Sequence, residues 1–417
     1  MAIKLLHFAD AHIDMSNYGR RNPQSGLPYR VEDYLAALDF IIDTAIERKV
    51  DLVIFAGDAY KDRTPAPTFQ REWGKRIMRL SAAHIPALLL VGNHDNSPAL
   101  GRASTLQEFD TLGISNIRVI DEPCFLSNED LGGFGAQVIG LPWIARSQML
   151  TAALNRVDLQ QEEAQVNFEK ALSDLIEVYM KNADPDLPLI LTAHGSVMGA
   201  KYGRERSVML GGDFVIARSL VCDPRLDYVA LGHIHKPQSL NDGAHPPVIY
   251  PGSIEKIDFG EIEDVKYCII AEVDRGNTSV EWVQLPGRRF IDRTVSIDES
   301  TLNPTQVIIS HLPSEDEMRE AVMRLIIEYP EGCETQIDQS AIDLATQDCF
   351  DFRLVKRPRL EARVRLSPDN QMASMSPIEL LEIYLKSKQM DPEETQILLA
   401  MAQSIVANEP TEVNDGT

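Results

Sequence analysis

Apolar and polar positions alternate in blocks through the first part of the chain. Short apolar runs at 3–8, 51–56 and 87–91 are typical of buried strands. Between them, the segments 32–48 and 69–80 have apolar residues three or four positions apart, which is the spacing of an amphipathic helix. Strands that alternate with helices in this way predict a layered α/β domain.

The pattern changes after residue 187, where strand-like runs follow one another closely. We expect strands at 187–193, 226–231, 246–250 and 267–273. Ahead of them, the pattern predicts helices at 99–109 and 160–181 and strands at 117–120 and 136–141. This density of strands indicates a second sheet, so the predicted fold class is α/β with two sheets.

A domain boundary is expected at 284–290, where Pro and Gly interrupt a strand-like run. Beyond it, the pattern predicts a smaller α/β unit with a strand at 293–297, a helix at 315–329 and a strand near 350–355. The run from Arg353 to Leu366 is the most basic in the sequence. It fits either a DNA-backbone contact or a solvated strand face.

The end of the chain reads as two helices. Residues 376–379 (SPIE) and 391–394 (DPEE) each have a capping residue followed by Pro at the first helical position. The apolar stripes that follow either pack on their own domain or bind a partner. The predicted domains are therefore an α/β domain at 1–286, a smaller domain at 287–370, a helical segment at 371–408 and a disordered acidic tail at 409–417.

Composition narrows the class of protein. None of the apolar runs approaches the ~20 residues that span a membrane, and the five dispersed cysteines read as reduced thiols. We therefore expect a cytoplasmic protein with no membrane contact. The net charge of -23 repels polyanions. A nucleic-acid substrate would thus require local basic patches, bound metal or a partner subunit.

Residues of metal-ligand type follow five of the predicted strands. They are Asp10 and His12 after the first, Asp58 after the second, Asn93 and His94 after the third, and His194, His233 and His235 after two later strands. In α/β sheets, ligand sites form outside the carboxyl ends of the strands. The DxH and HxH spacings place both side chains on one side of an extended chain. We therefore expect these residues to converge.

The residue types indicate two metal ions. Mixed imidazole, carboxylate and amide ligands suit Mn, Fe or Zn. Seven ligands from these eight residues exceed the needs of one ion, but two ions that share a bridging carboxylate would use all seven. Asp58 is the expected bridge, because it is the only strand-end carboxylate without a paired imidazole. Two ions ~3.5–4 Å apart suit phosphoryl displacement.

The order of these motifs, DxH, GD, GNHD, H and GHxH, resembles that of the calcineurin-like metallophosphoesterase superfamily. The resemblance extends from Asp10 to about Ser253, in a PGS segment. The opening KLLHFADAHID, the segment PGSIEKIDFGE and the small domain followed by helices are similar to the SbcD-type nuclease subunits. This resemblance implies a layered β-sandwich flanked by helices as the nuclease domain at 1–286, and a small α/β capping or DNA-binding domain at 287–370. It also implies C-terminal helices at 371–408 that bind an ATPase partner.

The resemblance also implies roles for individual residues. Two divalent ions are expected, with manganese the usual metal. The first would be held by Asp10, His12, Asp58 and His235, and the second by Asp58, Asn93, His194 and His233. His94 matches a histidine that does not bind metal but stabilises the developing charge and assists the leaving oxygen. Apart from the resemblance, Asp14 and Asp62 lie close to these motifs in the sequence, and we expect them to orient ligands without necessarily binding metal.

The implied function is a metal-dependent DNA nuclease of repair and recombination, with 3′–5′ exonuclease or endonuclease activity, or both, on DNA ends and hairpins. Its expected partners are DNA, an SbcC-like coiled-coil ATPase and a second copy of the chain, with 69–80 as the dimer contact. The alternative is a stand-alone phosphodiesterase or phosphatase for a small phosphoester or phosphoprotein. A metal-stabilised scaffold is a third hypothesis, against which the complete ligand set argues.

One position departs from the family pattern. Three residues after the GD aspartate, family members often carry His or an acidic residue, but this chain has Lys61. A lysine there is either a point-charge contact for the scissile phosphate or a solvated loop residue. The substitution leaves the polarity of cleavage and the balance of exonuclease to endonuclease activity open.

Overall fold

A computed structural model describes residues 2–96, 103–143, 161–203, 215–359, 377–387 and 391–407. The chain divides into two compact units. The first comprises 1–293, 312–325 and 343–354, and the second comprises 294–311, 326–342 and 355–417. Among the helices of the described residues, none is long and apolar enough to cross a membrane.

Two six-stranded sheets form the centre of the first unit. The first sheet has the order β14 (Asn277–Gln284), β13 (Tyr267–Asp274), β1 (Ile3–Phe8), β2 (Leu52–Phe55), β3 (Ala87–Leu90) and β4 (Ile117–Ile120). The second has the order β11 (Gln238–Ser239), β12 (Val248–Tyr250), β10 (Tyr228–Gly232), β7 (Leu189–His194), β6 (Gln137–Leu141) and β5 (Cys124–Leu126). Strands β1 to β4 pair in parallel, as do β6, β7, β10 and β12, so their carboxyl ends share an edge within each sheet.

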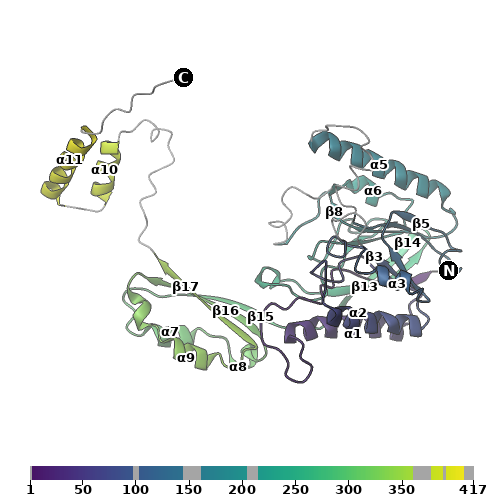
Figure 1. Ribbon diagram of the computed structural model, residues 1–417, viewed down its shortest axis with the longest axis horizontal. Coiled ribbons are helices and arrows are strands. Elements are labelled where there is room, and N and C mark those ends of the chain that lie inside the picture. The colour runs from purple at the N-terminus through teal and green to yellow at the C-terminus, as the bar shows by residue number, and fades with distance from the viewer. Residues whose placement is uncertain are drawn as a thin grey trace. The chain divides into compact units, whose positions relative to one another are not determined.

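Helices cover the outer faces of both sheets (Figure 1). On the first sheet lie α1 (Tyr29–Arg48) and α2 (Pro67–Ala82), and the second is covered by α5 (Gln161–Asn182) and α6 (Arg218–Val221). Apolar side chains from the inner faces of the two sheets form a separate core between them. The predicted layered α/β fold is therefore confirmed. Shorter elements of this unit are α3 (Gln107–Thr111), β8 (Ser196–Val197), β9 (Val215–Ile216) and a 3-10 turn, η2 (Phe259–Glu261).

A third sheet has three strands, in the order β15 (Phe290–Ser296), β16 (Val322–Pro330) and β17 (Asp351–Arg359). The connecting segments hold α7 (Pro304–Ser310), α8 (Glu315–Met318), η3 (Cys333–Gln336) and α9 (Gln339–Ala345). Near the end of the chain are α10 (Pro377–Ser387) and α11 (Pro392–Ala407). The Asp391 carboxylate accepts a hydrogen bond from the Glu393 amide at 2.8 Å, so the second predicted cap forms. Ser376 of the first cap, the tail 409–417 and the basic residues 360–366 lie outside the described residues.

Two predicted helices are wrong. The segment 315–329 is helical only at α8, because the chain leaves the helical conformation at Arg319, where ψ is 124°, and at Glu320, where φ is +57°. The residues that follow form β16, whose apolar side chains are mostly buried. Burial in the sheet outweighs their helical spacing. In the segment 99–109, the described residues 103–106 are not helical and α3 begins only at Gln107.

Candidate metal centre

The eight predicted site residues all lie at the carboxyl ends of parallel strands. Asp10 and His12 follow β1, Asp58 follows β2, Asn93 and His94 follow β3, His194 ends β7, and His233 and His235 follow β10. The backbone there is not extended as expected, because φ is positive at four of these positions: Asp10 (+51°), His12 (+39°), Asp58 (+65°) and His233 (+100°). Left-handed backbone is costly for residues with a Cβ and concentrates at functional sites.

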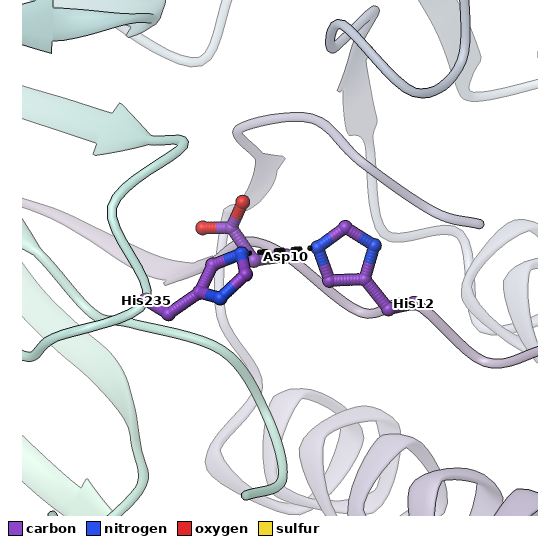
Figure 2. Close-up of side chains that lie close together, drawn as sticks. All are labelled: Asp10, His12 and His235. Carbon is purple, nitrogen blue, oxygen red and sulfur yellow. Dashed lines mark hydrogen bonds between the residues drawn. The ribbon is translucent and has the colours of Figure 1, made fainter. Parts of the chain in front are cut away.

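Buried Asp10 and His12 form one group with the partly buried His235 (Figure 2). Each offers a ligand atom, and these atoms all lie within 4.8 Å of one another. The Nε2 atoms of His12 and His235 are 3.2 Å apart. Asp10 also accepts the backbone amide of His233, at 3.0 Å to its nearer oxygen. The donor set of one carboxylate and two imidazoles fits a divalent transition-metal ion.

Asp58, His194 and His233 form a second group, which Asn93 joins. The Asn93 Oδ1 lies 3.0 Å from both the Nε2 of His194 and the Nδ1 of His233. Within the described residues, these are the two groups of three or more His, Cys, Asp or Glu residues with metal-ligand spacing. The structure thus contains two candidate metal-binding triads.

Asp58 lies between the two groups. Its Oδ2 is 3.4 Å from the Nε2 of His194 in the second group and 4.0 Å from the Nε2 of His12 in the first. Its Oδ1 accepts the backbone amide of His94 at 2.8 Å. This is the position that a bridging carboxylate needs.

Backbone carbonyl groups of the loop after β2 orient three of the imidazoles. The Nδ1 of His194 lies 2.6 Å from the Ala56 carbonyl oxygen, and the Nδ1 of His12 lies 3.2 Å from that of Tyr60. The Nδ1 of His94 lies 2.6 Å from the Lys61 carbonyl oxygen. An imidazole that donates from Nδ1 presents Nε2 as its free lone pair, so each ring directs Nε2 toward the site.

Three buried residues that the sequence analysis missed support the site: Asp95, Glu261 and Lys266. The Glu261 carboxylate lies 3.4 Å from the Nδ1 of His235 and 2.8 Å from the Nζ of Lys266. The Asp95 carboxylate accepts the backbone amides of Asp58, Ala59 and Gly92, at 2.8 to 3.0 Å. Asp95 belongs to the GNHD motif and Glu261 to the PGSIEKIDFGE segment, so both motifs carried a signal.

Trp143 lies beside the second group, with its ring centroid 5.1 Å from that of His233. Its backbone amide donates to the Val91 carbonyl at 2.8 Å, which ties the end of β6 to the end of β3. No pattern in the sequence singled out this residue, because a lone aromatic after a strand is common.

Burial and charge oppose each other at these groups. Burial raises the pKa of the Asp58 carboxyl, but the imidazoles of His194, His94 and His12 outweigh burial and hold this pKa well below its usual value. Burial lowers the pKa of His12 to about 3. His194 is also buried, yet the carboxylate of Asp58 raises its pKa to about 9. An ionised Asp58 beside a neutral His12 is the state in which both bind a cation.

Close backbone approach explains two glycines of the motifs. A Cβ at Gly92 would lie 2.1 Å from the Oδ1 of Asp58, and a Cβ at Gly57 would lie 2.3 Å from the Nδ1 of His194. Gly57 also has a φ of +99°. Glycine at both positions therefore allows the ligand side chains to reach the site.

Lys61 has an exposed side chain, and its contribution to the geometry comes from its backbone. Asp14 is buried and accepts the backbone amide groups of Lys61 and Asp62, the latter at 3.1 Å. The phosphate contact suggested for the Lys61 side chain stays a prediction.

Comparison with known proteins agrees with this geometry. The calcineurin-like phosphoesterase family profile matches residues 3–237. The SbcD component of the nuclease SbcCD of Escherichia coli (strain K12) is 27% identical over 298 residues, which cover 68% of each chain. The uncharacterized metallophosphoesterase YhaO of Bacillus subtilis (strain 168) is 26% identical over 282 residues, or 67% of this chain and 60% of YhaO.

Among solved structures, a dimetal phosphatase from Danio rerio aligns with 68% of this chain and 96% of its own, at 12% identity and a TM-score of 0.38. That likeness is too low to carry an argument. The family match covers more than half of the chain, and the chain therefore belongs to the calcineurin-like phosphoesterase family. The predicted resemblance to SbcD-type members is confirmed. The protein is accordingly a metal-dependent hydrolase of the metallophosphoesterase class.

Proposed function

We propose that this protein is a manganese-dependent DNA nuclease, and that it acts as the nuclease subunit of an ATPase-linked DNA repair complex. The observation that carries the proposal is the pair of buried ligand groups with Asp58 between them. The E. coli relative is a subunit of the nuclease SbcCD, which supports nuclease activity and assembly with a partner. DNA, the ATPase and the repair role come from the resemblance to SbcD-type subunits. Exonuclease and endonuclease activity on DNA ends and hairpins are both included in the proposal.

The ligand roles follow the two groups. Asp10, His12 and His235 would hold one ion, Asn93, His194 and His233 the other, and Asp58 both. Divalent ions bound there would polarise the phosphoryl oxygens of the scissile diester. Imidazole, carboxylate and amide donors accommodate Mn²⁺.

His94 is the proposed catalytic residue. It belongs to neither triad, and its Nδ1 bond to the Lys61 carbonyl leaves Nε2 to face the substrate. From there, Nε2 would hold a proton for the leaving oxygen and stabilise charge on the phosphoryl group. His94 is partly exposed, so a substrate can reach it.

DNA contact along β17 would have to replace existing ion pairs. Its four cations, Arg353, Lys356, Arg357 and Arg359, each lie within 4 Å of a carboxylate oxygen. These pairs are largely exposed, so exchange of their carboxylates for phosphates costs little. With a net charge of -23, the chain would still rely on metal and partner for most of its DNA affinity.

The terminal helices are the proposed partner site. Tyr384 on α10 and Ile397, Leu398 and Met401 on α11 are exposed large apolar residues. An SbcC-like coiled-coil ATPase would cover them. A homodimer would form through residues 69–80 of α2, where Met78 is exposed.

The deciding experiment measures cleavage of linear and hairpin DNA by the full chain with Mn²⁺, with and without a co-purified coiled-coil ATPase. We expect Mn²⁺-dependent cleavage, lost on chelation and reduced at least 100-fold in His94→Gln, because removal of a general acid costs 10²–10⁴-fold. Loss of DNA cleavage with retained hydrolysis of a chromogenic diester would favour the stand-alone phosphodiesterase instead. Light scattering of the same sample tests the dimer.

A further inference from the structure

The Lys61–Asp62 peptide group joins two side chains from opposite sides. Its carbonyl oxygen lies 2.6 Å from the Nδ1 of His94, and its N–H donates to the Oδ2 of Asp14 at 3.1 Å. The other carboxylate oxygen, Oδ1, accepts the N–H of Lys61. A continuous chain of hydrogen bonds therefore runs from Asp14 through one peptide group to His94.

We propose that Asp14 is a positioning residue that fixes the orientation and the tautomer of His94 through the Lys61–Asp62 peptide group. The proposal rests on the function proposed above, in which His94 is catalytic. Asp14 touches neither His94 nor the substrate position, and it is not a member of either triad. It acts by holding the carbonyl that takes the Nδ1 proton of the ring.

The chemistry of the peptide group supports this role. Two N–H groups on one carboxylate fix the loop at adjacent residues, so the Lys61 carbonyl has little freedom to turn. A carboxylate that accepts the peptide N–H also polarises the carbonyl of the same peptide, which makes it a stronger acceptor. An imidazole with Nδ1 held in this way keeps Nε2 for the reaction.

Position 61 explains why the chain would need such an arrangement. A side-chain carboxylate at this position could accept the Nδ1 proton directly, but lysine has no acceptor atom. The Lys61 backbone carbonyl takes that place, and the negative charge comes from Asp14, which is 9% exposed. The proton acceptor and the charge are thus divided between two residues.

The first test is a double-mutant comparison of DNA cleavage by the Mn²⁺-loaded full chain. Asp14→Asn replaces one acceptor oxygen with a donor, so one of the two N–H groups loses its partner. We expect kcat to fall about tenfold, the change that loss of about one hydrogen bond gives, with KM and bound metal unchanged. In a His94→Gln background, Asp14→Asn should change kcat by less than about twofold, because its effect passes through His94.

Asp227→Asn is the matched control. Asp227 is also buried and accepts two backbone amides, those of Leu189 and Gly276, at 2.8 and 2.7 Å. It is far along the chain from His94 and bonds no residue of the site. Its variant should leave kcat unchanged in either background. Equal losses from Asp14→Asn with and without His94, or a loss no larger than that of Asp227→Asn, would overturn the proposal.

The second test needs no activity and is read in the wild-type protein, with His94→Gln used only to assign the His94 signals. Long-range ¹H–¹⁵N spectra of histidine-labelled wild-type protein, loaded with diamagnetic Zn²⁺, report the tautomer of each ring. We expect the Nδ1–H tautomer for His94, assigned by its absence in His94→Gln. An Nε2–H tautomer would refute the role of Asp14. If the wild type cut no phosphodiester, the proposed function would fail, but this measurement would still test the hydrogen-bond chain from Asp14 to His94.

Discussion

Left-handed backbone and close glycine contacts together set the geometry of the individual ligands. Asp10, His12, Asp58 and His233 all have positive φ, and such conformations persist only where surrounding contacts hold them. Asp95 supplies such contacts by accepting the backbone amides on both sides of the Gly57–Gly92 approach. The site is therefore held by its loops as much as by the strands.

Gly92→Ala should abolish binding of metal to the group around Asp58. The added Cβ would meet the Asp58 Oδ1 at 2.1 Å and the Asp58 backbone nitrogen at 2.5 Å. Metal analysis of the purified chain should show at least one Mn²⁺ fewer than in the wild type. Gly74→Ala in α2 is the control, because its Cβ meets nothing within 4 Å. It should retain all metal and gain up to about 1 kcal/mol of stability. Full metal content in Gly92→Ala would contradict this reading of the glycine.

Glu261→Gln should weaken Mn²⁺ binding at the group that contains His235. The amide cannot match the carboxylate that lies 3.4 Å from the His235 Nδ1, and the buried Lys266 loses its charged partner. Loss of such an outer-shell group costs 10–100-fold in metal affinity, an order-of-magnitude expectation. Calorimetric titration with Mn²⁺ measures it. Glu255→Gln, which alters an equally buried glutamate bonded to the Lys256 and Arg288 amides, should leave the affinity unchanged.

The convergence of the candidate ligands could be predicted from the sequence, because few residue types bind metal and each followed an apolar strand. Their backbone conformation could not. The period-two argument assumed an extended chain at Asp10 and His12, where φ is in fact positive. Asp95 and Glu261 were missed because they act through backbone or long-range contacts, and the spacing of residues in a sequence does not encode such contacts.

At the scale of elements, the alternation of strands and helices was predictable wherever one face of an element is polar. The segment from Val322 to Pro330 was not, because its apolar residues also fit a helical period. Only its position between β15 and β17 decides in favour of a strand. The domain limits predicted at 286, 370 and 408 stay predictions.

The contact between β1 and β10 predicts a pH effect on stability. His7 on β1 lies between the two sheets, with its Nδ1 3.0 Å from the Tyr228 hydroxyl and its Nε2 3.2 Å from the Leu231 carbonyl oxygen. Burial lowers the pKa of His7 to about 3 in the folded chain, below the unfolded value of about 6.5. Between pH 6.5 and pH 3, only the unfolded chain takes up a proton at His7. The contribution of the buried, neutral His7 to the free energy of unfolding is therefore lost as the pH falls through this range.

The measurement is urea unfolding of metal-free wild type and His7→Gln at pH 7 and pH 5. Between pH 7 and pH 5, the free energy of unfolding should fall by about 2 kcal/mol more in the wild type than in the variant. This figure follows from 1.36 kcal/mol per pKa unit. The comparison cancels other groups that titrate in both proteins. Equal losses in the two proteins would mean that His7 accepts a proton in the folded state.

At the scale of the whole molecule, an excess of 23 negative charges opposes both compaction and DNA binding. The candidate metal centre holds both Asp10 and Asp58 in the interior, where repulsion between carboxylates is least screened. Two divalent ions would cancel that local repulsion but only a small part of the total charge. The local repulsion in the metal centre should therefore be relieved by Mn²⁺, and the repulsion among the charges of the whole molecule by salt.

Thermal unfolding separates these two effects. Without metal, a rise in NaCl should raise Tm, because salt screens repulsion among exposed carboxylates. Micromolar Mn²⁺ should raise Tm further at any salt concentration, because each occupied site adds about 2.7 kcal/mol to the free energy of unfolding when the free ion exceeds Kd 100-fold. Asp58→Asn removes the shared ligand, so it should lose most of the Mn²⁺ effect and keep the NaCl effect. If Mn²⁺ stabilised Asp58→Asn as much as the wild type, the ion would act on the surface charge, and the buried groups would not be its binding site.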